Sequence, residues 1–174
     1  MNRTQKVISA VSGLVGLAAA TVGATLFIKD VEGVRYETYP DVGGVLTTCY
    51  GHTGKELFPG QKFTPEECDE LLSIDLEKKL NYVMKRLPKD TPALVIAAMA
   101  SFVYNVGEGN ANKATVFKML QRGETIKACD ALLAWKYVGK RDCSIRSNGC
   151  YGVWDRRQSE RELCYAGFGQ TIPK

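Results

Sequence analysis

Three side chains suited to acid–base chemistry, Glu32, Asp41 and Thr47, are closely spaced in this chain. Glu32 lies between the apolar residues Val31 and Val34, and apolar neighbours disfavour an ionised carboxyl group. If Glu32 ends a helix and a hairpin returns across that end, the three groups can face one opening. A protonated carboxyl with a second group that manages water is the equipment for cleaving a glycosidic bond. The alternative is that both acids are ordinary solvated surface residues.

The sequence lacks the residues that other classes of catalytic site require. His52 is the only histidine, which excludes a multi-histidine metal site, and no Cys-x-x-Cys pair replaces one. There is no Gly-x-Ser-x-Gly nucleophile elbow, and a protease built on Cys49 and His52 is a weak alternative. The Gly-Glu-Gly turn at residues 107–109 lacks the lysine of a phosphate-binding loop.

The composition is that of one globular domain. Of the 174 residues, 45% are hydrophobic and 24% are charged, which excludes wholesale disorder. The net charge is +4, and Arg3 and Lys6 supply two of those charges, so residues 29–174 carry only +2. This balance argues against nucleic acid as a partner and is compatible with an anionic polymer such as cell wall.

The cysteine content indicates an oxidising compartment. The number of cysteines is even and predicts three disulfides; the residues are Cys49, Cys68, Cys129, Cys143, Cys150 and Cys164. Many pairings are open from the sequence alone, although Cys143 and Cys150 flank a short polar stretch that a bridge could staple. The alternative is buried free thiols in a cytosolic protein.

The N-terminal segment, residues 7–28, carries no charge; it follows Arg3 and Lys6 and ends before Lys29. At about 1.5 Å per residue, a helix of this length just crosses a bilayer core of about 30 Å, with its N-terminus in the cytoplasm. Twelve of its 22 residues are Ser, Thr, Gly or Ala, so insertion is expected to be marginal.

Three fates are compatible with such a segment. Ala18-Ala19-Ala20 offers a small-x-small site for cleavage of a signal peptide. The many small residues disfavour a permanent anchor. The favoured interpretation is a segment that inserts, later leaves the membrane and packs against its own domain. All three fates carry the domain to an oxidising exterior, which agrees with the cysteines.

A long helix is predicted after residue 64. Thr64 as N-cap and Glu67 form a capping box that starts it, Pro65 takes the first helical position, and Pro88 stops it. Its apolar stripe consists of Leu72, Leu76, Leu80, Val83 and Leu87. Such a helix is long enough to link two lobes.

The elements around this helix predict an α+β fold with a cleft between two lobes. Before it, a short helix leads into a hairpin with its turn at residues 41–44 and a strand at 45–50. After it, residues 93–104 are apolar all round, which indicates a helix buried at the centre of a larger helical lobe. Further helices are expected at 113–121, 125–135 and 156–165, the last with Asp155 as its N-cap and Gln158 in its capping box.

The run from Glu32 to His52 resembles the Glu–eight residues–Asp–five residues–Thr signature of phage-type lysozymes, glycoside hydrolase family 24. The stretches 101–107 and 156–161 agree with that family, and the resemblance covers residues 29 to about 168. It implies a phage-lysozyme-like α+β fold, in which the long helix joins a small β-containing lobe to a larger helical lobe. Residues 1–28 resemble the signal-anchor-release segment of a subgroup of endolysins, and residues 29–174 then form the catalytic domain.

The resemblance implies an endolysin muramidase that hydrolyses the β-1,4 bond between N-acetylmuramic acid and N-acetylglucosamine in peptidoglycan during phage-induced lysis. Glu32 would be the general acid, and Asp41 and Thr47 would position the attacking water, with inversion at the anomeric carbon. Tyr104 and Asn105 are expected to contact substrate, because a phenol and an amide suit the N-acetyl and hydroxyl groups of sugars. No metal or organic cofactor is required, and a monomer is expected.

The resemblance also implies a location. In the endolysin subgroup, the N-terminal segment tethers an inactive enzyme to the inner membrane until depolarisation releases it. We therefore expect residues 7–28 in the host inner membrane at first and the released chain in the periplasm. The rival functions are a lytic transglycosylase on the same bond, against which Asp41 and Thr47 argue, and a non-catalytic, membrane-anchored wall-binding protein.

Cys49 follows Thr47 by two residues, where many relatives have glycine. A structural bridge with Cys68 is favoured over a redox switch, because the switch of some tethered endolysins uses a cysteine inside the membrane segment, and residues 7–28 have none. On the same logic, Cys129 and Cys164 are expected to form the second pair.

Two further features each allow two interpretations. His52 is favoured as a structural residue at the base of the lobe, and the alternative is a contact with substrate. The arginines of residues 156–161, with Glu160 and Glu162, are favoured as a salt-bridged helix surface over a polymer-binding patch.

Overall fold

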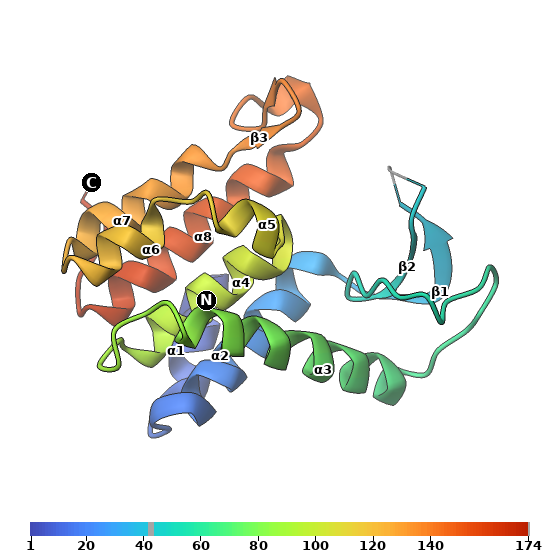
Figure 1. Ribbon diagram of the computed structural model, residues 1–174, viewed down its shortest axis with the longest axis horizontal. Helices are drawn as coiled ribbons and strands as arrows, with labels where there is room; N and C mark the ends of the chain where they lie inside the picture. Colours follow the sequence, from blue (N-terminus) through green and yellow to red (C-terminus); the bar gives the residue numbers. More distant parts are fainter. Residues whose placement is uncertain (42–43, 174) are drawn as a thin grey trace.

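The structure is a computed structural model that describes residues 1–41 and 44–173. A β-hairpin with its loops forms one end of the molecule, a larger group of helices forms the other, and α3 runs between them (Figure 1). The helices are α1 (Arg3–Val11), α2 (Gly16–Glu32), α3 (Pro65–Met84), α4 (Ala93–Val106), α5 (Glu108–Ala111), α6 (Val116–Gln121), α7 (Thr125–Ala131) and α8 (Tyr151–Gly167), with 3₁₀ turns at Leu132–Ala134 and Arg146–Asn148. The strands are β1 (Arg35–Pro40), β2 (Leu46–Cys49), β3 (Tyr137–Val138) and β4 (Arg141–Asp142).

The small lobe is built on the antiparallel pair β1–β2. Tyr39 pairs with Thr47 and Arg35 pairs with Cys49, with an irregularity between these two points. At the predicted turn the Gly44 amide donates to the Asp41 carbonyl (3.0 Å); residues 42–43 of that turn lie outside the described residues. The hairpin is therefore the one that the sequence predicts.

The long helix α3 begins as its sequence predicts. The Thr64 side chain accepts from the Glu67 amide (3.2 Å), and the Glu67 carboxylate accepts from the Thr64 amide (2.7 Å). Pro65 is the first helical residue of this capping box. The helix ends at Met84, four residues before Pro88. All five residues of the predicted apolar stripe are buried.

The larger lobe is organised around α4. This helix is apolar on all sides because α2, α3 and α8 each pack against it. Phe102 of α4 meets Trp135 edge to face, with ring centroids 5.3 Å apart, an arrangement that aromatic pairs favour. The bridge Cys129–Cys164 ties α7 to α8. The fold is α+β, as expected.

Several predicted boundaries in this lobe are wrong. The expected helix 113–121 begins only at Val116, and the one-turn helix α5 occupies part of the stretch that was expected to be a turn. The second small sheet, β3–β4, was not predicted. Asp155 does not cap α8, which already begins at Tyr151; its carboxylate instead accepts from Arg3 Nη1 (3.0 Å). Asp155 therefore forms a long-range ion pair with Arg3 and not the predicted N-cap.

The N-terminal segment folds back on itself as two helices, α1 and α2, that pack against each other and against the larger lobe. The chain reverses between them at Gly13 and Gly16, which have φ angles of +87° and +57°. Such angles disfavour residues with a Cβ. Gly23 allows close approach of α4, because a Cβ there would lie 3.3 Å from that of Ala97. In the described part of the chain, no helix combines the length and apolarity required to cross a membrane.

The boundary that the sequence analysis places after residue 28 falls inside α2. Phe27 and Ile28 are fully buried in the core of the larger lobe, together with Ala20 and Ala24. The same helix therefore carries the end of the apolar segment and, four residues later, Glu32.

Candidate active site

Glu32 is the last residue of α2. Gly33 follows with a φ of +66°, which lets the chain leave the helix and enter β1. The Glu32 side chain is 25% exposed and forms an ion pair with Nη1 of Arg156 from α8. The expectation of an apolar setting is thus wrong in part, because Val34 is 37% exposed and a guanidinium contacts the carboxylate.

Arg156 is itself held by buried groups. Its Nε donates to Glu160 Oε1 (3.1 Å), and its Nη2 donates to the Ser101 carbonyl (3.0 Å). The Ser101 hydroxyl donates to the same Glu160 oxygen (2.6 Å). Ser101 and Glu160 are fully buried, and Arg156 is 4% exposed. The guanidinium that contacts Glu32 therefore has little freedom to move.

Arg157 continues this network toward Asn105. Its Nη2 donates to Asn105 Oδ1 (3.1 Å) and to Glu160 Oε1 (3.0 Å). Burial lowers the pKa of Arg157, although the charge of Glu160 works in the opposite direction. The fully buried side chains of Arg157 and Glu160 thus fix the position of the exposed Asn105 amide.

A groove opens at this point between α2, α4 and the start of α8. Its described lining residues are Val31, Glu32, Asn105, Gly149, Cys150, Gly152, Val153 and Arg156. The groove brings together two of the predicted site residues, Glu32 and Asn105. The disulfide Cys143–Cys150 closes a short loop in its wall.

Asp41 and Thr47 lie on the neighbouring hairpin and are not among these lining residues. Asp41 is at the far turn, where its Oδ1 accepts from the Val45 amide (2.9 Å). Thr47 is 5% exposed and donates its hydroxyl to the Val45 carbonyl (3.1 Å). The other end of the hairpin approaches Glu32, because a Cβ at Gly51 would lie 4.0 Å from Glu32 Oε2.

Tyr104 of α4 connects the two lobes. Its hydroxyl donates to the carbonyl of Tyr50 (2.9 Å), in the turn that follows β2. Burial raises the pKa of Tyr104, and the negative charges of Asp75 and Glu32 act in the same direction. The phenol therefore stays protonated as a donor between the hairpin and α4.

His52 lies in the small lobe with both ring nitrogens occupied. Nδ1 is 2.6 Å from Asp75 Oδ2 on α3, and Nε2 is 2.9 Å from Glu56 Oε1. His52 is 7% exposed. Burial disfavours its charged form, but the hydrogen bonds to the two carboxylates outweigh burial and raise the pKa of His52. These contacts are those of a structural residue.

This arrangement predicts a pH-dependent contribution to stability. Because the folded-state pKa of His52 is raised, its stabilising effect is complete below the unfolded-state pKa of about 6.5 and is lost as pH rises through the folded-state value. Asp75→Asn should therefore lower the free energy of unfolding by about 1–2 kcal/mol at acidic pH, and less above neutrality. Thermal unfolding from pH 5 to 9 measures the difference. Lys78→Ala is the control, since it removes only the exposed partner of Asp75 (3.3 Å); a pH-independent effect of Asp75→Asn would contradict the prediction.

The favoured interpretation of the arginine cluster is wrong for its first half. Arg156, Arg157 and Glu160 form neither a helix surface nor an exposed patch but the buried support of Glu32 and Asn105. Arg161 does belong to the surface, where it pairs with Asp130 (2.6 Å). The sequence did contain a signal for this cluster. Residues 101–107 and residues 156–161 agree with the same family, and these two stretches meet at Glu160.

The disulfides link the elements around this site. Cys49–Cys68 ties the end of β2 to the first turn of α3, and Cys129–Cys164 and Cys143–Cys150 are the other two bridges. These are the pairs that the sequence analysis favoured, and none of the six cysteines is left as a free thiol. The hairpin is therefore covalently fixed to the helix that links the lobes.

Comparison with known proteins agrees with this fold. Residues 29–160 match the model of the phage lysozyme family, and the chain therefore belongs to that family of glycoside hydrolases. It is 38% identical to the SAR-endolysins of Bacteriophage PS119 and Bacteriophage PS34 over 162 residues, which are 92% of this chain and 93% of each relative. Within the family it falls in the SAR-endolysin subgroup.

Two solved structures share the fold. The endolysin from Escherichia coli O157:H7 phage FAHEc1 superimposes with a TM-score of 0.72 at 26% identity, over 93% of this chain and 99% of that one. The active form of the P1 phage endolysin Lyz gives a TM-score of 0.71 over 97% of this chain and 96% of that one; at 23% identity this shows the fold alone.

Proposed function

We propose that this endolysin hydrolyses the β-1,4 bond between N-acetylmuramic acid and N-acetylglucosamine in peptidoglycan, with Glu32 as the general acid. The observation that carries the proposal is the position of Glu32, the acid of the family signature. It ends α2 at the edge of a groove, beside a guanidinium that three hydrogen bonds to buried acceptors hold in place. The amide of Asn105 lines the same groove and suits an N-acetyl group.

The chemistry assigns one task to each group. Glu32 gives its proton to the glycosidic oxygen as the bond to the anomeric carbon breaks. Water attacks that carbon from the opposite face. Asp41 and Thr47 orient the water, and the Asp41 carboxylate takes up its proton. As Glu32 loses its proton, it becomes a carboxylate beside Arg156, whose positive charge stabilises the negative charge that develops.

We also propose that residues 7–28 first lie in the host inner membrane and that the released chain acts as a monomer in the periplasm. The weak hydrophobicity of the segment and the positive charge before it support insertion with a cytoplasmic N-terminus. The three bridges support an oxidising compartment. In the released chain, α1 and α2 bury much of the apolar surface of the segment in the larger lobe.

Analysis of the products tests the reaction. Purified peptidoglycan is digested with the full-length protein, and the fragments are identified by mass spectrometry. We expect reducing N-acetylmuramic acid ends, heavier by one water than the anhydro ends that a transglycosylase forms. Anhydro ends would assign the protein to the transglycosylases, and intact glycan strands would indicate a wall-binding protein without catalysis.

A further inference from the structure

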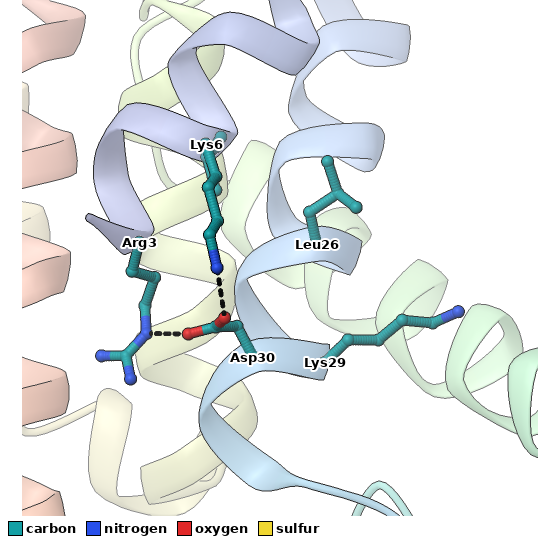
Figure 2. Close-up of a pocket in the computed structure, with 6 residues that line it drawn as sticks. Arg3, Lys6, Leu26, Lys29 and Asp30 are labelled. Atoms are coloured by element: carbon teal, nitrogen blue, oxygen red, sulfur yellow. Dashed lines mark hydrogen bonds and ion pairs between the residues drawn. The ribbon is translucent and has the colours of Figure 1, made fainter. Parts of the chain in front are cut away.

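Arg3, near the N-terminus, bridges two helices of the larger lobe. Its Nε lies 2.6 Å from Asp30 Oδ2 on α2, and its Nη1 lies 3.0 Å from Asp155 Oδ2 on α8. Nη1 also donates to the Ser159 hydroxyl (2.9 Å). Figure 2 shows the Arg3 and Lys6 side chains converging on Asp30 where α1 lies beside α2.

The two carboxylates that Arg3 joins are neighbours of the proposed catalytic acid and its partner. Asp30 precedes Glu32 by two residues at the end of α2, and Asp155 immediately precedes Arg156 in α8. The Arg3 bridge and the ion pair between Glu32 and Arg156 thus connect the same two helices at the same level. A shift of α2 against α8 would disturb both contacts together.

We propose that Arg3 is a positioning residue for the reaction: its guanidinium fixes α2 against α8 and so holds Glu32 in register with Arg156. This inference rests on the proposed role of Glu32. A forked guanidinium suits the task because it can bind two carboxylates in fixed directions, which a lysine ammonium cannot do.

The bridge also depends on the state of the N-terminal segment. Arg3 and Asp30 are 27 residues apart and lie at opposite ends of the uncharged stretch. In one continuous helix they would be separated by roughly 40 Å, at about 1.5 Å per residue. The bridge can form only when the chain reverses at residues 12–15 and α1 folds back on α2. The Arg3 bridge is therefore a contact of the folded-back N-terminal segment.

Docking of α1 does not depend on Arg3 alone. The Thr4 hydroxyl donates to Glu162 Oε2 (2.7 Å), the Asn2 side chain donates to Glu162 Oε1 (3.2 Å), and Val7 is buried in the core. Removal of the Arg3 side chain should therefore leave α1 in place while breaking the bridge. This makes the catalytic effect separable from loss of the fold.

The test compares four full-length variants, purified in soluble form, with the wild type: Arg3→Ala, Asp155→Asn, the double variant and Lys6→Ala. Because small misplacements of catalytic groups are costly, we expect Arg3→Ala and Asp155→Asn each to lower kcat by about tenfold, with KM unchanged within about twofold. The double variant should be no slower than Arg3→Ala, since both changes break one bridge. Lys6→Ala is the matched control: it also removes one N-terminal positive charge, but Lys6 is 58% exposed and, among the described residues, forms its ion pair with Asp30 (3.7 Å) and none with α8.

Limited proteolysis of residues 1–20 and thermal unfolding accompany the kinetics. Wild-type kcat in Arg3→Ala, multiplying effects in the double variant, or an equal loss in Lys6→Ala would overturn the inference. So would a protease-sensitive N-terminus in Arg3→Ala combined with wild-type kcat in Asp155→Asn, because Arg3 would then act only in docking. Failure of the proposed function would give a different result, because the wild type would then cleave no faster than Glu32→Gln. The role of Arg3 would be rejected in that case too, since it rests on Glu32.

Discussion

Glu32→Gln is expected to lower the rate of peptidoglycan cleavage by about 10²–10⁴-fold, the usual contribution of a general acid. The amide keeps the size of the side chain and can still accept from Arg156, but it carries no proton that it can donate to a leaving oxygen. The folded state should be little affected, because Arg156 retains its buried contacts with Glu160 and Ser101. The measurement is the release of reducing ends from purified peptidoglycan, together with thermal unfolding of both proteins.

Glu70→Gln is the matched control for this experiment. It makes the same chemical change at an exposed position of α3, outside the groove that Glu32 lines. The control should cleave at the wild-type rate. If Glu32→Gln cleaved as fast as the control, Glu32 would not be the acid. If it lysed cells without cleaving, the biological effect would come from binding to the wall.

Local sequence signals predicted the elements whose ends are fixed by local contacts. The capping box of Thr64 and Glu67 needs only residues three apart, and it starts α3 where expected. The stripe from Leu72 to Val83 needs only helical periodicity, whereas Leu87 is buried beyond the end of α3. Asp155 carried an equally good capping signal, but its carboxylate is used by Arg3, 152 residues away, and no local rule anticipates that pair.

The buried residues that hold Glu32 in place could not be predicted from the sequence, for a related physical reason. Arginines and glutamates three and four residues apart on a helix are usually solvated, so Arg156, Arg157 and Glu160 indicated a surface. Their burial depends on α4, which supplies Ser101 and Asn105 as polar partners inside an apolar lobe. Fully buried charges are tolerated only when such partners are present. Tertiary packing, and not the spacing of the charges, decides where they lie.

Replacing Gly13, Gly16 and Gly23 together with leucine is expected to hold the protein in the membrane fraction and to prevent timely lysis. Each leucine favours insertion by roughly 0.3–0.6 kcal/mol. The same changes oppose the released fold, because Gly13 and Gly16 have positive φ angles and a side chain at Gly23 would crowd Ala97. Fractionation after depolarisation and the time course of lysis measure both effects.

Single substitutions separate these two causes. Ala10→Leu adds apolar surface at an exposed position of α1, whereas Gly23→Leu adds a similar surface where a Cβ would already lie 3.3 Å from that of Ala97. If refolding of the segment against α4 stabilises the released state, Gly23→Leu should retain far more protein in the membrane than Ala10→Leu does, because overpacking costs about 1–3 kcal/mol. Equal retention would mean that insertion strength alone sets release. Lysis on schedule by the triple variant would remove escape from the bilayer as the controlling step.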